Sequence, residues 1–297
     1  MPRRLVLVVN PEAGGGRARR LLPAVEAGLR AAGHDLLVRP TRSLEHADEL
    51  AAGGVADDRV VVAMGGDGLV GRLAGTVADA GGLLGVLPGG RGNDFARSVG
   101  LDRDPRRALA VLEHGRERRV DLGEVSSAAG TAAFLGIASV GFDSEVQERA
   151  LISRLPLGQL VYLQAALTTV SGWRPARFTA RVDGVPLALT GWTFAVSNSG
   201  TYGGGMRLAP AASVQDGLLD VVTVGPVSRA RFLRALPELF LGTHVRRPGI
   251  AVQPAVRVEL DADRPFRVFA DGDPVAVLPC TVTVRAGALR VLLPARP

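Results

Sequence analysis

The sequence predicts two domains: an α/β domain with a parallel sheet over residues 1–121, and a domain of antiparallel β-strands over residues 122–297. The chain has 297 residues and is 47% apolar, which is enough for a sizeable core in each domain. The first 120 residues alternate apolar strands with helical patterns, as is typical of a helix-covered parallel sheet. From about Asp121 the pattern changes to short, β-branched runs between turns, which favours antiparallel pairing.

The first half predicts strands and helices in alternation. Apolar runs predict strands at 5–9, 35–39, 60–64 and 83–87, and helical periodicity predicts helices at 17–32, 44–52, from the glycines after Met64 to about Ala80, and at 105–115. Glycine-rich turns follow three of these strands. Ligands usually bind at the carboxyl ends of parallel strands, so we expect a ligand at this edge.

The second half predicts strands at 131–138, 177–182, 192–197, 220–224, 256–260, 266–269 and 282–284. Two helical patterns interrupt them, at about 147–170 and 228–241. The stretch 152–173 carries an apolar stripe formed by Leu155, Leu157, Leu160, Leu163 and Leu167, with Trp173 at its edge. Such a stripe more often packs into a core than lies on a membrane, and both interpretations stay open here.

The positive charge comes from arginine alone, because the chain has no lysine, and the formal net charge is +6. A Walker-type P-loop and Schiff-base chemistry both need a lysine and are excluded. Arginine suits phosphates and anionic lipids, but without a dense basic block or RNA-binding signature we expect no nucleic-acid partner. The single cysteine, Cys280, and a start without a signal peptide's apolar core lead us to expect a reducing, cytoplasmic setting.

The first glycine-rich turn follows the strand at 5–9 and opens a helix. It reads Asn10-Pro11-Glu12-Ala13-Gly14, and two more glycines follow. Main-chain N–H groups at such a turn can meet a phosphate, and glycine lets the main chain approach it closely. A turn that serves only to reverse the chain would have the same composition, so both interpretations stay open.

The second turn, Gly65-Gly66-Asp67-Gly68, also ends a strand and precedes a helix. Its one carboxylate lies between glycines, whose loss of conformational entropy a plain helix cap would not require. We expect Asp67 to contact a ribose, a phosphate-bound Mg²⁺ or an attacking hydroxyl, besides acting as a cap.

The third turn runs from Leu87 to Arg97 and places Asn93 and Asp94 where a helix should start. Capping alone would explain one polar residue. Arg91 and Arg97 indicate an anion, although solvated surface arginines are the alternative.

These three turns, in this order, resemble the catalytic domain of the diacylglycerol kinase and lipid kinase family, which includes the sphingosine kinases. The resemblance continues through the second half and covers nearly the whole chain. Further segments that look like family segments are Thr41 with His46-Ala47, 120–123, 134–143, 203–210, 216–220 and 271–273. Their joint occurrence is far more specific than any one glycine motif.

The resemblance implies a nucleotide-binding α/β domain joined to a β-sandwich domain, with ATP between them. The implied ATP-binding residues, with Asn93 and Asp94 added from the third turn, are Asn10, Pro11, Glu12, Ala13, Gly14, Thr41, Gly65, Gly66, Asp67, Gly68, Leu69, Arg91, Asn93 and Asp94. It further implies a lipid substrate, with peripheral contact at the inner face of the membrane. A homodimer stays open.

The resemblance also implies a metal site and a general base. Ser213, Asp216 and Leu218 match positions that hold a structural Mg²⁺ in bacterial relatives, partly through backbone carbonyls. Asp273 matches the general base. Since a lipid hydroxyl is a poor nucleophile near neutral pH, Asp273 and Asp67 are the candidate catalytic carboxylates.

Several positions depart from the family pattern. A threonine, an asparagine and a glutamate are usual after the second turn, a threonine in the third, an asparagine before Gly141 and a glutamate at the base position; here these places hold Leu69, Gly71, Arg72, Arg91, Gly136 and Asp273. Each lost hydroxyl removes a hydrogen bond of about 0.5–1.5 kcal/mol, whereas an arginine can bind phosphate more strongly.

Two alternatives to an active lipid kinase therefore stay open. The first is a catalytically impaired relative that binds lipid or nucleotide. The second is a kinase for a specialised or soluble alcohol, related to NAD kinases or phosphofructokinases, which share a Gly-Gly-Asp-Gly turn.

Overall fold

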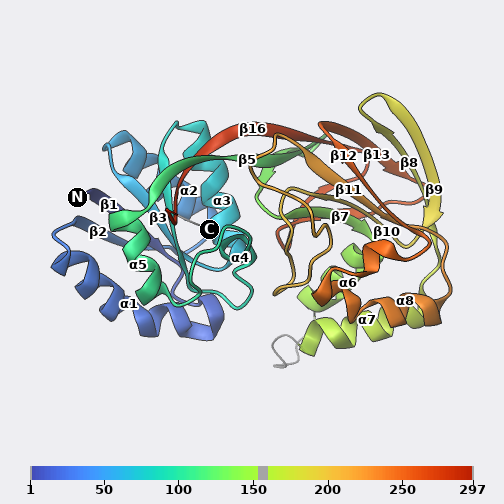
Figure 1. Cartoon of the computed structure of the whole chain (residues 1–297), viewed down its shortest axis with the longest axis horizontal. Coiled ribbons are helices and arrows are strands. Elements are labelled where there is room, and N and C mark those ends of the chain that lie inside the picture. Colours follow the sequence, from blue (N-terminus) through green and yellow to red (C-terminus); the bar gives the residue numbers. More distant parts are fainter. Residues whose placement is uncertain (1, 153–159, 296–297) are drawn as a thin grey trace.

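The computed structural model describes residues 2–152 and 160–295 (Figure 1). A four-stranded parallel arrangement begins the chain, with strand order β2-β1-β3-β4. Its strands are β1 (Arg4–Val9), β2 (Asp35–Pro40), β3 (Val60–Gly65) and β4 (Leu83–Pro88). Helices cover both faces, which explains why Leu5 to Val9 are all buried. The predicted parallel α/β architecture is confirmed.

The helices of this half alternate with its strands. They are α1 (Ala13–Ala31), α2 (Leu44–Ala56), α3 (Asp67–Asp79), the short α4 (Asp94–Ser98) and α5 (Pro105–His114). Side chains of α1 and α5 belong to one apolar cluster, and those of α2 and α3 to another across the sheet. The carboxyl ends of β1, β3 and β4 thus remain available at one edge, where all three glycine-rich turns lie.

Two long strands connect the halves of the molecule, as Figure 1 shows. They are β5 (Arg116–Ser127) and β16 (Cys280–Leu293), which pair antiparallel over most of their length. The C-terminal part of β16 joins the parallel strands of the first half, where Arg290 pairs with Leu83 of β4. The N-terminal part of β16 pairs with β13 (Arg257–Ala262), and the sheet continues through β8 (Ala176–Val182) to β9 (Val185–Gly191). On the other side of β16, β5 pairs in turn with β6 (Gly130–Phe134). Position 121 lies within β5, and the division there stays a prediction.

A second, antiparallel sheet faces this extension and completes a sandwich. Its order is β12 (Ile250–Ala255), β11 (Leu219–Val224), β10 (Thr193–Ser197), β7 (Ile137–Gly141), β14 (Arg267–Ala270) and β15 (Asp273–Val277). Aromatic side chains fill the space between the sheets, with the Phe178 and Phe194 rings 6.1 Å apart. The predicted antiparallel β-sandwich is confirmed.

Helices α6 (Phe142–Ile152), α7 (Leu160–Gly172), α8 (Arg229–Ala235) and α9 (Glu238–Leu241), with the 3₁₀ turn η1 (His244–Arg246), pack around this sandwich. Three predicted elements are divided in the structure. The strand expected at 131–138 breaks at Leu135 and Gly136, and the helix expected at 228–241 breaks at Pro237, which cannot continue the hydrogen-bond ladder. The helix expected at 147–170 is two helices, α6 and α7.

The apolar stripe of α7 is only partly a core face. Leu155 and Leu157 lie outside the described residues, as do the side chains of Leu160 and Leu163. Leu167 is 54% exposed, whereas Val161, Ala165 and Val170 are buried. Among the described residues, no helix is both long enough and apolar enough to cross a bilayer.

Candidate functional site

The three glycine-rich turns contact one another through their main chains. Gly89 and Gly90 donate hydrogen bonds to the carbonyl oxygen of Gly65, at 2.8 and 3.0 Å. A Cβ atom on Gly90 would lie 2.4 Å from the Cα of Gly66, and one on Gly14 would lie 2.6 Å from the carbonyl oxygen of Gly89. Side chains larger than hydrogen therefore cannot occupy these positions without moving backbone, so the sequence builds one glycine-walled edge from three separate turns.

The first turn presents main-chain groups beside arginine side chains. Gly14, Gly15 and Gly16 have φ values of 64°, 68° and 79°, so the regular part of α1 starts only after them. The Arg91 guanidinium lies over Gly15, since a Cβ there would be 3.2 Å from its Nη2. At the start of the turn, Glu12 forms an ion pair with Arg19, whose Nη1 lies 2.9 Å from Glu12 Oε1. This edge is basic and suits an anion.

Other predicted nucleotide residues have more local contacts. The main-chain N–H of Thr41 donates to Val9 at 2.8 Å, which brings Thr41 to the same edge. Asn10 holds the turn together by accepting from the N–H of Glu12. The Leu69 side chain is buried in the core against Gly65, which leaves only its main chain for a ligand.

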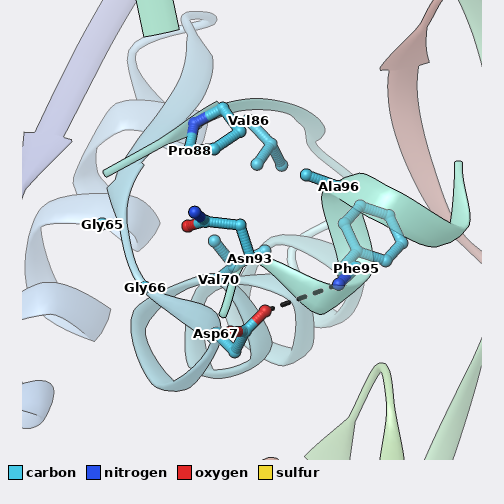
Figure 2. A pocket seen from close by; sticks show the side chains of 9 residues that line it. All are labelled: Gly65, Gly66, Asp67, Val70, Val86, Pro88, Asn93, Phe95 and Ala96. Carbon is cyan, nitrogen blue, oxygen red and sulfur yellow. Dashed lines mark hydrogen bonds between the residues drawn. The ribbon is translucent and has the colours of Figure 1, made fainter. Parts of the chain in front are cut away.

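Asn93 shapes the third turn. Its φ of 53° is left-handed, and its amide exchanges two hydrogen bonds of 2.9 Å with the main chain of Gly90. Figure 2 shows it facing the second turn. The space enclosed between these two turns does not admit a water molecule, so it is interior packing, and a ligand would have to lie outside it.

Asp67 links the second and third turns. Its Oδ1 accepts from the main-chain N–H of Asp94 at 2.6 Å and from that of Phe95 at 3.4 Å. Figure 2 shows the second of these hydrogen bonds. Asp67 was expected to cap α3, but it is the first residue of that helix, and Gly66 occupies the N-cap position. The Asp67 carboxylate instead caps the start of α4. Burial raises the pKa of the Asp67 carboxyl, and the hydrogen bonds oppose that rise.

Asp94 lies next to Asp67 and reaches into the second half of the chain. Its Oδ2 accepts from the N–H of Gly204 at 2.7 Å. Its Oδ1 is buried and has no hydrogen-bond donor among the described residues, and Arg97 Nε lies 3.8 Å away. Burial, followed by repulsion from Asp67, raises the pKa of Asp94 to about 6. Such a carboxylate pair with an unused oxygen is suited to a divalent cation.

Asp273 is the first residue of β15 and lies near the start of α3. Its Oδ2 would lie 2.9 Å from a Cβ on Gly68, so it rests against the first turn of α3. Burial raises the pKa of its carboxyl, and Arg72, which is bound to Asp48 at 2.6 Å, lowers it. The two predicted catalytic residues are thus close at the start of α3, which Asp67 begins and which the Asp273 carboxylate contacts at Gly68, although 206 positions separate them in the chain.

Asp271 is a member of the group to which the sequence analysis assigned no role, since it was noticed only as part of the family-like segment 271–273. Its carboxylate accepts from the N–H groups of Leu135, Gly136 and Ile137, at 2.7, 2.8 and 3.1 Å. Burial raises its pKa to about 7, with Asp67 contributing. A Cβ on Gly71 or on Gly136 would lie within 2.7 Å of this carboxylate. The glycines at positions 71 and 136, both departures from the family pattern, therefore leave space for the Asp271 side chain.

We call Asp67, Asp94, Asp271 and Asp273 the acidic centre. All four have raised pKa values with burial as the largest cause. The signal in the sequence was a nearby glycine: Asp67, Asp271 and Asp273 are each next to one, and Asp94 follows Gly92 by two positions. Their convergence depends on the long strands β5 and β16, which a linear pattern does not reveal.

The turn that carries the predicted metal residues leads into β11. Ser213 Oγ accepts from Gln215 at 3.2 Å, and Asp216 accepts from Leu218 at 3.1 Å. Asp121 ties this turn to β16 by accepting from Gly217 at 2.8 Å and Gly287 at 2.6 Å. The sequence segment 120–123 was noticed, but the role of Asp121 in it was missed.

The donor set of this turn fits a hard cation. Burial, followed by repulsion from Asp216, raises the pKa of Asp220, and a cation between them would relieve that repulsion. In the described part of the chain, no three His, Cys, Asp or Glu side chains are placed so that they could hold a metal by themselves, either at this turn or at the acidic centre. Binding here would therefore have to use main-chain carbonyls as well.

Comparison with known proteins gives two family matches that together span the chain. Residues 4–125 match the diacylglycerol kinase catalytic domain, and residues 136–293 match the YegS C-terminal NAD kinase beta sandwich-like domain. A diacylglycerol kinase of Mycobacterium tuberculosis is 33% identical over 98% of this chain and 95% of its own length. A probable lipid kinase YegS-like of Pseudomonas aeruginosa is 35% identical, again over 98% of this chain and 95% of its own length.

The fold is likewise that of solved structures. The crystal structure of a diacylglycerol kinase from Bacillus anthracis superposes with a TM-score of 0.74 and 19% identity, covering 99% of this chain and 97% of the other. At that identity the likeness concerns the fold alone.

Proposed function

Since the chain belongs to the lipid kinase family in which a diacylglycerol kinase catalytic domain precedes a YegS-type β-sandwich, we propose that it transfers the γ-phosphate of ATP to the hydroxyl of diacylglycerol or a similar lipid alcohol. One observation carries the proposal: the acidic centre lies directly beside the glycine-walled edge, with residues from both halves of the chain. An anion-binding edge and a set of carboxylates are the two parts that phosphoryl transfer needs.

The glycine-walled edge would hold the triphosphate. The main chain of Asn10 to Gly14 and of Gly65 to Leu69 would face it, with Thr41 beside them. Arg91 supports this role because its guanidinium lies over the left-handed glycines, where it would make a charge-assisted bond to phosphate. Asn93 acts through the shape of its turn, since both ends of its amide are already bonded to Gly90.

Two metal positions are proposed. Mg²⁺ bound with the nucleotide neutralises developing charge on the phosphates. Asp67 and Asp94 would hold it, because they are close neighbours and no donor in the described part of the chain reaches Asp94 Oδ1. Ser213, Asp216 and Leu218 would hold a second, structural Mg²⁺, which would fix the turn that Asp121 ties to β16.

Asp273 is the proposed general base. In the reaction the lipid oxygen forms a bond to the γ-phosphorus, the bond from that phosphorus to the β,γ-bridging oxygen breaks, and the hydroxyl proton passes to the Asp273 carboxylate. Asp273 is suited to this because its carboxyl has a raised pKa and accepts no hydrogen bond from the described main chain, unlike Asp271. General base assistance of this kind contributes about 10² to 10⁴-fold.

The substrate class places the reaction at a membrane. We propose that the chain works in the cytoplasm and contacts the inner membrane surface peripherally, because the acceptor resides in a bilayer. The departures at Leu69 and Arg91 favour a changed nucleotide affinity over loss of activity, since the main-chain edge keeps its glycines and the departure at Asp273 keeps a carboxylate.

The test is incubation with labelled ATP, Mg²⁺ and mixed micelles of detergent with diacylglycerol, followed by mass spectrometry of the extracted lipids. Label in a phosphorylated lipid, absent with Asp273→Asn, is the expected result. If Mg-ATP raises the melting temperature but no lipid acquires phosphate, the acceptor is a different alcohol. If Mg-ATP produces no thermal shift, the nucleotide assignment itself is wrong.

A further inference from the structure

An exposed apolar pair ends helix α9. Phe240 and Leu241 are 57% and 71% exposed, and Gly242 follows them in a left-handed conformation that ends the helix. A single exposed apolar side chain is ordinary on a protein surface. Two large ones in succession form a small patch whose contact with water is unfavourable, and a membrane or another protein would relieve it.

The surroundings of this pair are strongly basic. Residues 228–247, which we call the α8–α9 segment, contain five arginines and one glutamate, and Glu238 is bound to Arg247. The segment thus carries five minus one, or four, of the chain's net six positive charges in 20 of its 297 residues. The exposed members are Arg229, Arg231, Arg234 and Arg246. Arginines beside exposed phenylalanine and leucine are the composition of a segment that lies on an anionic bilayer.

The segment is held firmly by the fold. The Phe232 side chain is buried, and its ring stacks on Trp192 with centroids 4.0 Å apart. Ser228 caps the helix by accepting from the N–H of Arg231. The exposed arginines of α8 therefore belong to an anchored helix, so little order would have to be gained on docking.

The apolar pair is also connected to the acidic centre. The carbonyl oxygen of Leu239, next to Phe240, accepts from the N–H of Arg207 at 2.7 Å. Three residues before Arg207, the N–H of Gly204 donates to Asp94. Three Cα steps span at most about 11 Å, so a bilayer at Phe240 would lie close to the proposed reaction centre.

A competing surface is less suited to an anionic membrane. Leu151, Ile152, Tyr162 and Leu167 are also exposed, on α6 and α7. However, α6 carries three acidic residues and one arginine, a net charge of minus two, and α7 carries no charge. Charge complementarity therefore favours the α8–α9 segment.

We propose that the α8–α9 segment is the surface on which the protein docks to a bilayer containing anionic phospholipid, with Phe240 and Leu241 entering the interface and the arginines of α8 facing the headgroups. The inference deepens the proposed function, on which its biological sense rests. Docking there would present the membrane surface to the loop of Gly204, beside Asp94.

The experiment is co-sedimentation of the protein with phosphatidylcholine vesicles, with and without phosphatidylglycerol. We expect the unaltered protein to bind only the anionic vesicles, and less at high salt. The double variant Phe240→Ser/Leu241→Ser should bind at least about tenfold more weakly, since burying either side chain is worth about that much. Arg231→Gln/Arg234→Gln should lose about fivefold for each arginine.

Matched controls lie on the β8–β9 hairpin. Val185→Ser removes an exposed apolar side chain and Arg181→Gln an exposed charge, and both should bind vesicles as the unaltered protein does. Equal losses in these controls, or wild-type binding by the Phe240/Leu241 variant, would overturn the proposal. Loss of binding confined to Ile152→Ser/Leu167→Ser would assign docking to α6 and α7 instead.

Two further readouts separate this inference from the proposed function. A dimer in solution that the Phe240/Leu241 variant dissociates, with vesicle binding unchanged, would make a second copy the occupant and refute docking to lipid. Kinase activity towards a short-chain, water-soluble diacylglycerol should be the same in this variant as in the unaltered protein. Absence of that activity in both, with vesicle binding still lost in the variant, would refute the proposed function and leave the docking surface standing.

Discussion

The two sides of the candidate site are built by different means. The glycine-walled edge comes from one half of the chain and offers mainly main-chain groups, with arginines around it. The acidic centre draws on both halves and offers side-chain carboxylates with raised pKa values. A main-chain edge tolerates change in neighbouring side chains, whereas a carboxylate cluster depends on each member. This difference explains how Leu69 and Arg91 can depart from the family pattern in the nature of the side chain, whereas the departure at Asp273 keeps a carboxylate.

The largest expected effect is on the acidic side. Asp273→Asn and Asp67→Asn should each lower kcat by about 10² to 10⁴-fold, because a carboxylate that accepts a proton or holds a cation is lost. Phosphate transfer to lipid measures this, and Asp57→Asn, an exposed position, is the control. The thermal shift with Mg-ATP should persist in Asp273→Asn. A kcat near that of the unaltered protein in both variants would show that the acidic centre is not the place of reaction.

The next effect concerns the glycine side. Gly90→Ala should lower the free energy of unfolding by about 3 kcal/mol, because the new Cβ would lie 2.4 Å from backbone. Gly53→Ala in α2 meets nothing within 4 Å and should raise stability by up to about 1 kcal/mol. Urea denaturation measures both. Similar effects of the two substitutions would mean that the turns do not pack as closely as described.

The raised pKa of Asp94 predicts a pH dependence. The unfolded chain loses this proton near pH 3.8 and the folded chain near pH 6, so between them the folded state binds more protons. The free energy of unfolding should therefore fall as pH rises through this window, by ~2 kcal/mol after allowance for partial exposure. Asp94→Asn should flatten that part of the profile, as followed by urea denaturation without divalent ions. An unchanged slope would contradict the burial of this carboxyl.

The smallest effect belongs to the turn of Ser213, Asp216 and Leu218. A metal at ten times its Kd stabilises a folded protein by about 1.4 kcal/mol, so chelation should lower the melting temperature by a few degrees. Asp216→Ala should remove this response to chelation, whereas Asp273→Asn should keep it. A response that disappears only with Asp67→Asn would place the ion at the acidic centre alone.

Local patterns predicted most of the first half well. The strand at β1 and the turn at Gly65 to Gly68 could be read directly, because apolar runs and glycines act over a few residues. Asp271 could not, since its partners Leu135 to Ile137 are more than 130 positions away and only folding brings them together. For the same reason the long pairing of β16 with β5 and β4 was not foreseen from its short apolar run at 282–284.

The central claim is that the glycine-walled edge grips a triphosphate beside the acidic centre. A crystal structure with Mg²⁺ and a non-hydrolysable ATP analogue tests it most directly. The account predicts phosphates over Gly14 to Gly16 and Gly65 to Gly68. It also predicts a cation bound to Asp67, and an Asp273 carboxylate that faces the terminal phosphate. A nucleotide bound elsewhere, with Asp67 and Asp273 remote from its phosphates, would contradict it.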